Sequence, residues 1–150
     1  FLFVGEGTEK ESIVAKARAL DMGNITFLPG QPRESVPGFY RASSLCLVPL
    51  RNIALFDSFV PSKMFEIMAA GRPILGAVRG EAAEILGRSG AAVVVPPENP
   101  EAMATAIHQL YRDSASCERM GESGRRFVAM EFSRSKLARR YLDLLGSIGS

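Results

Sequence analysis

Hydrophobic and polar positions change along the chain in short blocks that predict strands separated by helices. Brief apolar runs bounded by turn-forming residues predict strands over residues 1–4, 25–28, 45–50, 74–78 and 91–95. The first of them, residues 1–4, is entirely apolar and is expected to be buried. Apolar residues at helical spacing predict helices over residues 8–22, 34–42, 61–70, 81–86, 100–113, 115–130 and 133–145. Strands joined in this way predict right-handed crossovers, and therefore a Rossmann-like doubly wound α/β domain whose parallel sheet carries helices on both faces.

Two of the predicted helices begin with local capping signals. Thr8 is followed three residues later by Glu11, which is the spacing of a capping box. Asn99 precedes Pro100, and this pair suits an N-cap followed by the first helical position. We therefore expect side-chain caps at both helix starts.

The segment of residues 60–75 is the most informative part of the chain, because it combines a loop, a helix and a buried strand. Pro61 suits a helix start and Gly71 suits the left-handed position that ends a helix. Lys63 and Glu66 lie three residues apart near the start of this helix, within side-chain reach of each other. One interpretation is a phosphate held at the helix N-terminus with an acid for sugar hydroxyls. The alternative is a solvated ion pair in an ordinary strand–helix–strand unit.

The composition bounds the class of protein. The chain has 150 residues, 47% of them hydrophobic and 23% charged, which is typical of one soluble globular domain. A net charge of +2 is too small to argue for nucleic acid. Cys46 and Cys117 lie in apolar or helical runs, so we expect thiols and a reducing compartment. The single histidine, His108, is expected at the surface, and no metal-binding spacing is present.

Several segments resemble one enzyme family. Residues 61–73, with the pattern Pro-Ser-Lys-x-x-Glu and then Ala-Ala-Gly-Arg-Pro, resemble the donor-site segment of the retaining glycosyltransferases of family 4, which have the GT-B fold. The Pro-Ser-Lys form resembles a branch of bacterial surface-polysaccharide sugar transferases. The glycine turn of residues 4–8 and the strand and helix start of residues 91–102 are also similar to that family. The resemblance implies that residues 1–150 form a single domain, most of the C-terminal nucleotide-sugar-binding domain. The N-terminal acceptor domain and the first strand–helix unit are then expected outside this sequence.

The resemblance also implies which residues meet the donor. The implied contacts are Glu66 with the ribose, Ser62 and Lys63 with the diphosphate, Asp57 and Ser58 with the sugar, and Leu28 and Pro29 with the nucleobase, while Gly5, Gly7 and Gly80 form glycine turns that line the cleft. Many members carry a glutamate eight residues before the ribose-binding one, where this chain has Ser58. Arg79 stands where a small residue is usual. No catalytic residue is assigned in this segment.

The function implied by the resemblance is a hexosyltransferase-type glycosyltransferase that moves a sugar from a nucleotide-diphosphate-sugar donor with retention. The implied acceptor is a lipid-linked or saccharide intermediate of bacterial envelope polysaccharide synthesis. We expect no metal and no cofactor, and a UDP-sugar is favoured over a GDP-sugar. Two alternatives stay open: a nucleotide-sugar 2-epimerase of similar architecture, and a non-catalytic GT-B-derived binding domain, which the serine at position 58 favours.

The expected partners follow from that function. They are the nucleotide sugar and an acceptor glycan or polyprenyl-linked glycan bound through the N-terminal domain, with no nucleic acid. The chain alone is expected to be inactive. The expected location is the cytoplasm, and the basic residues among positions 134–140 leave peripheral association with the inner face of the cell membrane open.

Overall fold

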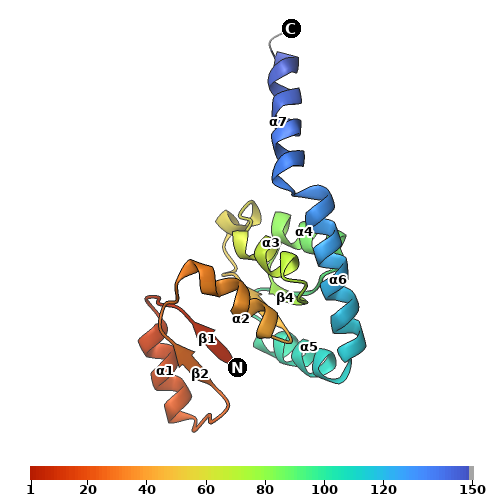
Figure 1. Ribbon diagram of the computed structural model, residues 1–150. Helices are drawn as coiled ribbons and strands as arrows, with labels where there is room; N and C mark the ends of the chain where they lie inside the picture. The colour runs from red at the N-terminus through yellow and green to blue at the C-terminus, as the bar shows by residue number, and fades with distance from the viewer. Residues whose placement is uncertain (149–150) are drawn as a thin grey trace. The chain divides into compact units, whose positions relative to one another are not determined.

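The computed structural model describes residues 1–148 and is an α/β structure with parallel strands (Figure 1). Its elements in chain order are β1 (Leu2–Val4), α1 (Lys10–Ala19), β2 (Thr26–Leu28), the 3-10 helix η1 (Arg33–Ser35), α2 (Val36–Ala42), β3 (Cys46–Pro49), the 3-10 helix η2 (Ala54–Asp57), α3 (Ser62–Ala69), β4 (Ile74–Ala77), α4 (Gly80–Ser89), β5 (Ala92–Val95), α5 (Pro100–Arg112), α6 (Ser114–Glu131) and α7 (Arg134–Ile148). The predicted order of strands and helices is confirmed.

The chain divides into two compact units, Phe1–Gly38 and Phe39–Ser150, with the boundary inside α2. This division describes packing within the chain, and the prediction of a single domain stays a prediction. The strands pair as two sheets, β1 with β2 and β3 with β4 and β5, and every pairing is parallel.

The first unit has a small apolar interior. β1 pairs with β2 so that Phe3 lies opposite Phe27, and their rings stack with centroids 5.2 Å apart. The prediction that the first strand is buried is wrong, because its residues remain 39% to 49% exposed. Within this unit β1 has one neighbouring strand and one crossover helix, which leave much of its surface open. Ala17 is the only buried residue among positions 1–38.

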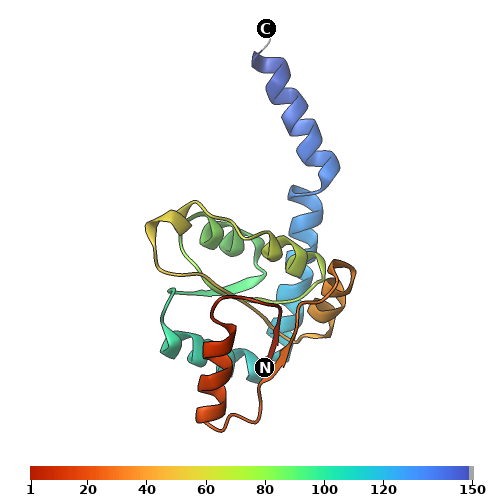
Figure 2. The ribbon, with the colours of Figure 1, turned by 90° about the vertical axis from the view of Figure 1, so that its left-hand side faces the viewer.

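The second unit has a layered core. All four residues of the central strand β4 are buried, as expected for a strand with a neighbour on each side and helices on both faces. Figure 1 shows α3 and α4 on one side of β4 and α5 on the other, and Figure 2 shows the same layers from the side. Ile74 packs into a cluster with side chains of α3 and α4, whereas Leu75 packs with Ala106 of α5. The predicted two-faced arrangement is therefore confirmed in this unit.

Two glycines of α6 allow it to lie against the C-terminal end of α3. A Cβ atom at Gly121 would lie 2.2 Å from the carbonyl oxygen of Gly71, and one at Gly124 would lie 2.8 Å from the Ala91 side chain. Gly71 itself has a φ of +69°, the left-handed conformation predicted for a residue that ends a helix. The absence of side chains at Gly121 and Gly124 therefore allows α6 to pack closely against the C-terminal end of α3.

The predicted helix starts are confirmed in part. The Asn99 side chain accepts a hydrogen bond of 2.9 Å from the Ala102 N–H, as expected for an N-cap. Thr8 does not cap a helix, because α1 begins at Lys10, whose N–H donates to the Gly7 carbonyl. The predicted helix over residues 81–86 is longer, because the left-handed glycine that ends α4 is Gly90.

The last helix, α7, has no buried residue. Before it, the Glu131 carboxylate accepts hydrogen bonds from Lys136 at 2.9 Å and from Arg140 at 3.0 Å, and both lower the pKa of Glu131. In the part of the chain that the structure describes, no helix is both long and apolar enough to cross a membrane.

Candidate functional site

The start of α3 presents polar groups that its own helix does not use. Pro61 occupies the N-cap position, with extended backbone, and the Met64 N–H donates to its carbonyl at 3.0 Å. The N–H groups of Ser62 and Lys63 belong to the first helical turn, where no intrahelical acceptor exists. Both residues are exposed, because the buried face of the helix consists of Met64, Ile67 and Met68. The sequence pattern thus places an exposed cation and exposed N–H groups at the positive end of a helix dipole.

Glu66 lies one turn further along α3, and its exposed carboxylate accepts one long hydrogen bond of 3.4 Å from the Tyr40 hydroxyl. Burial raises the pKa of Tyr40, and the neighbouring Glu66 charge adds to the rise. Among residues 1–148, Lys63 and Glu66 form no ion pair with each other. The alternative of a solvated Lys63–Glu66 pair is therefore not what the structure shows.

The connection of residues 51–60 contains η2 and is held against the loop after β4. Arg79 forms an ion pair with the Asp57 carboxylate through Nε, and its Nη2 donates to Asp57 Oδ2 at 2.7 Å. Its Nη1 donates to Asn52 Oδ1 at 2.6 Å. The Arg79 hydrogen bonds lower the pKa of Asp57. Ser58, the next residue, is exposed.

Gly80 is brought directly against Asp57. It has a φ of +60°, and a Cβ atom built on it would lie 2.1 Å from the Asp57 carbonyl oxygen. A side chain at this position is excluded both by the backbone conformation and by the contact. The structure thus joins two predicted site residues that sequence reasoning treated separately.

In the first unit, the glycine turn is joined to the loop after β2. The Gly5 N–H donates to the Leu28 carbonyl at 3.2 Å, and the Gly30 N–H donates to Glu6 Oε1 at 3.1 Å. The Lys10 ammonium donates to the Gly5 carbonyl at 3.0 Å and to both Glu6 oxygens. The hydrogen bond from Lys10, followed by that from Gly30, lowers the pKa of Glu6. Gly5 is therefore joined to the end of β2 at Leu28, and its neighbour Glu6 is joined to Gly30 in the loop that follows Pro29.

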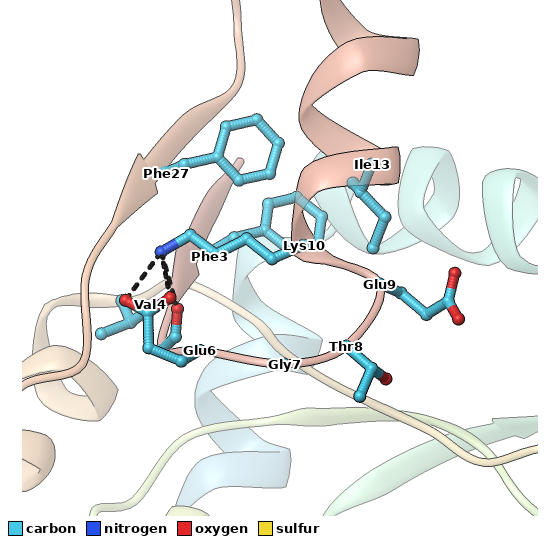
Figure 3. Close-up of a pocket in the computed structure, with 10 residues that line it drawn as sticks. Phe3, Val4, Glu6, Gly7, Thr8, Glu9, Lys10, Ile13 and Phe27 are labelled. Carbon is cyan, nitrogen blue, oxygen red and sulfur yellow. Dashed lines mark hydrogen bonds and ion pairs between the residues drawn. The ribbon is translucent and has the colours of Figure 1, made fainter.

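An open groove of about 370 Å³ adjoins this turn (Figure 3). Its apolar lining includes Phe3, Ile13 and Phe27, and its polar lining includes the Lys10–Glu6 pair. Since the Lys10 charge is already shared among Glu6 and backbone carbonyls, the ammonium supports the turn, and the groove shows no open cation for a phosphate.

Two residues were noted in the sequence without an assigned role in the donor site, His108 and Arg79. His108 is exposed on α5, as predicted. Arg79 was noted only because the family has a small residue at this position. That difference was the sequence feature that could have pointed to its contact with Asp57 and Asn52. Tyr40 and Asn52 gave no signal, because each lies more than 25 residues from its partner in the chain. In the described residues, no group of three or more His, Cys, Asp or Glu side chains is placed to hold a metal ion, and metal independence stays a prediction.

Comparisons with solved structures identify the fold. Sucrose-phosphate synthase from Thermosynechococcus elongatus superposes with a TM-score of 0.80 at 23% identity, over 98% of this chain and 38% of that chain. The Anabaena protein HepE, in complex with UDP, superposes with a TM-score of 0.81 at 17% identity, over 97% of this chain and 40% of that chain. The expected GT-B fold, of which this chain forms one part, is thereby confirmed.

Curated relatives point to the same class. The putative colanic acid biosynthesis glycosyl transferase WcaI of Escherichia coli K12 is 31% identical over 114 residues, which are 73% of this chain and 27% of that protein. The D-inositol 3-phosphate glycosyltransferase of Salinispora tropica is 28% identical over 144 residues, which are 95% of this chain and 29% of that protein. The matched region thus spans less than a third of each relative's length.

A family model described as "Glycosyl transferases group 1" matches residues 1–127. This match covers most of the chain, and the chain therefore belongs to the group 1 glycosyl transferase family.

Proposed function

We propose that this protein is the donor-binding part of a glycosyltransferase that uses a nucleotide-diphosphate sugar. The observation that carries the proposal is the start of α3, where Ser62 and Lys63 are exposed at the helix N-terminus and Glu66 lies one turn away. Lys63 has no ion-pair partner in residues 1–148. Exposed polar groups that have no protein partner, such as the Lys63 ammonium, are available to a ligand.

The chemistry of these groups matches the parts of a nucleotide sugar. The Lys63 ammonium and the first-turn N–H groups are suited to a diphosphate, and the helix dipole favours its negative charge. When the sugar leaves, negative charge builds on the diphosphate, and a preorganised cation stabilises that charge. The Glu66 carboxylate accepts hydrogen bonds and is suited to the two ribose hydroxyls.

Similar proteins support the choice of donor and acceptor. HepE has been crystallised with UDP and with UDP-glucose, and WcaI is described as a colanic acid biosynthesis enzyme. We accordingly propose a UDP-sugar donor, retention at the anomeric carbon without a metal, and membership in the Pro-Ser-Lys branch of family 4. We also propose a lipid-linked or saccharide acceptor of envelope polysaccharide synthesis, held by a separate domain, and an enzyme located in the cytoplasm. The nucleobase contacts of Leu28 and Pro29 remain part of the proposal.

The direct test is a calorimetric or NMR titration of the 150-residue chain with UDP, GDP and UDP-glucose. We expect saturable binding of UDP, weakened roughly ten- to a hundredfold in Glu66→Ala, because hydrogen bonds to a charged group are lost. Glu122→Ala is the matched control, since Glu122 is also an exposed helical glutamate. Equal UDP affinity in wild type and Glu66→Ala would reject the assigned ribose contact.

A non-catalytic binding domain is the alternative that one observation favours. Position 58 carries a serine, and the neighbouring Asp57 carboxylate is already paired with Arg79. On this alternative the full-length protein binds UDP and UDP-glucose with similar affinity and releases no UDP from the sugar nucleotide in the presence of acceptor lipids. Turnover by the full-length enzyme that depends on Glu66 rejects it.

A further inference from the structure

The side chain of Arg79 joins two segments that lie far apart in the sequence. Its guanidinium donates to both Asp57 oxygens and to Asn52, which precede it by 22 and 27 residues. A planar guanidinium that meets a carboxylate with two parallel N–H groups fixes orientation as well as distance. Asp57 and Asn52 both belong to the connection of residues 51–60, which is longer than most loops and has only the short helix η2.

A second contact fixes the same point of the loop through the backbone. The Asp57 carbonyl lies where a Cβ of residue 80 would be, so only glycine allows the loop to come this close. An exposed ion pair by itself contributes little to stability. Here the ion pair, the Asn52 hydrogen bond and the Gly80 contact act on one segment, so that Asp57 is held from its side chain and from its main chain.

This arrangement separates the two candidates for the sugar contact. Both Asp57 oxygens already accept hydrogen bonds from Arg79, and three Arg79 nitrogens are engaged. These bonds fix the orientation of the Asp57 carboxylate and use one lone pair of each of its oxygens, so Asp57 is committed first to Arg79. Ser58 is exposed, and its side chain forms no hydrogen bond within residues 1–148. The rings of Phe56 and Phe59, on either side of it, pack with centroids 5.4 Å apart and stiffen the segment.

We propose that Arg79 is a positioning residue for donor-sugar recognition: by holding Asp57 and Asn52, it sets the place of the connection of residues 51–60 and leaves Ser58 to meet the sugar. The inference rests on the proposed function for its last step, and on the contacts of Arg79 alone for the first.

The first experiment needs no nucleotide. Hydrogen exchange of the amides in residues 51–60 is compared among wild type, Arg79→Ala, Asp57→Ala and the double variant. We expect each single variant to raise the exchange rates about tenfold, and the double variant to add little, because both remove one shared interaction. Arg79→Lys keeps the charge but lacks the two parallel N–H groups of the guanidinium, so we expect its exchange rates to lie between those of wild type and Arg79→Ala. Arg119→Ala, an exposed arginine of α6, is the control. Unchanged exchange in Arg79→Ala, or additive effects in the double variant, overturns the loop contact.

The second experiment compares UDP with UDP-glucose and UDP-N-acetylglucosamine. In Arg79→Ala we expect the affinity for the better UDP-sugar to fall about tenfold, while the affinity for UDP changes less than about twofold, since the proposed ribose, diphosphate and nucleobase contacts do not involve residues 51–60. Ser58→Ala should show the same split, and Asp57→Ala should add nothing to Arg79→Ala. A further loss on adding Asp57→Ala would make Asp57 the sugar ligand and overturn the inference.

The two experiments separate the possible failures. A folded wild-type chain that binds neither UDP nor a UDP-sugar rejects the proposed function and the sugar step, and the exchange rates then decide the loop contact. A wild-type chain that binds UDP tightly and gains nothing from the sugar keeps the donor site and overturns the role of Arg79 in sugar recognition. Equal losses for UDP and the UDP-sugar in Arg79→Ala would indicate general damage and also overturn it.

Discussion

The start of α3 and the connection before it carry polar side chains in opposite situations. At the start of α3, Lys63 has no ion pair in the described residues, and Glu66 receives one long hydrogen bond from Tyr40. In residues 51–60, both Asp57 oxygens and the Asn52 Oδ1 accept hydrogen bonds from Arg79. The two acidic residues, Asp57 and Glu66, thus have different roles, because Glu66 is left open to solvent whereas Asp57 is bonded to the Arg79 side chain.

A side chain whose polar atoms bond to other parts of the protein stabilises the shape of the loop that carries it. An exposed polar side chain with no protein partner is available to a ligand. Substitutions at Gly80, Lys63 and Tyr40 and a change of pH distinguish these two roles.

Gly80→Ala should have the largest effect, on the stability of the packing between Gly80 and the connection of residues 51–60. The added Cβ would meet the Asp57 carbonyl at 2.1 Å in a left-handed backbone conformation. We expect the free energy of unfolding to fall by about 3 kcal/mol or more, as measured by denaturant unfolding. Gly87→Ala on the same helix is the control, because nothing lies within 4 Å of its Cβ, and it should raise stability by up to about 1 kcal/mol. Similar stabilities for the two variants would contradict the close contact.

Lys63→Ala should have the next largest effect, on UDP binding at the start of α3. Removing the ammonium takes one positive charge from the diphosphate site, so we expect UDP affinity to fall about tenfold, with the folded state unaffected. The salt dependence of UDP binding should also become weaker than in wild type. Calorimetry at two ionic strengths measures both, and Lys16→Ala is the exposed-lysine control. An unchanged salt dependence would count against a phosphate contact.

Low pH should weaken the contact between Asp57 and Arg79 and so raise amide exchange in residues 51–60. The Arg79 hydrogen bonds lower the pKa of Asp57 below its ordinary value of 3.8. The stabilisation is therefore complete above that ordinary value and is lost as the pH falls through the lowered pKa. Amide exchange in residues 51–60, corrected for intrinsic rates, should stay constant from about pH 7 to 5 and rise severalfold below about pH 4. Arg79→Ala should show no such step, and a step at the same pH in that variant would assign it to another group.

Tyr40→Phe should have the smallest effect. The variant keeps the ring, which packs against the core, and removes the hydroxyl that donates to Glu66 at 3.4 Å. A bond of this length to an exposed carboxylate is weak, so we expect UDP affinity to change less than about twofold. A tenfold loss in the same titration would show that Tyr40 orients Glu66 and that the carboxylate is less open than we conclude.

The sequence predicted local features well where the signal was local. The order of strands and helices, the Asn99 cap and the left-handed Gly71 are all confirmed, because each depends on residues within one turn. The Thr8 cap failed because the backbone of Gly7 accepts the bond in place of the side chain. Burial of the first strand failed because apolar composition does not reveal how many neighbours a strand has.

For the candidate site, the sequence pattern alone nominated the start of α3, since Lys63 and Glu66 lie on one exposed helix face. It did not determine whether they pair with each other, which depends on where Tyr40 and the helix axis lie. The contact of Arg79 with Asp57 and Asn52 was also not predicted. The three side chains are brought together by the pairing of β3 with β4, which local sequence patterns do not reveal.

Short-range backbone preferences and hydrophobic periodicity were thus enough to predict the alternation of strands and helices, the ends of α3 and the types of side chain offered to a ligand. Which polar side chains bond within the protein and which remain without a partner could be seen only in the folded chain. That choice depends on contacts between residues more than twenty positions apart, and it is made when the strands and helices pack together.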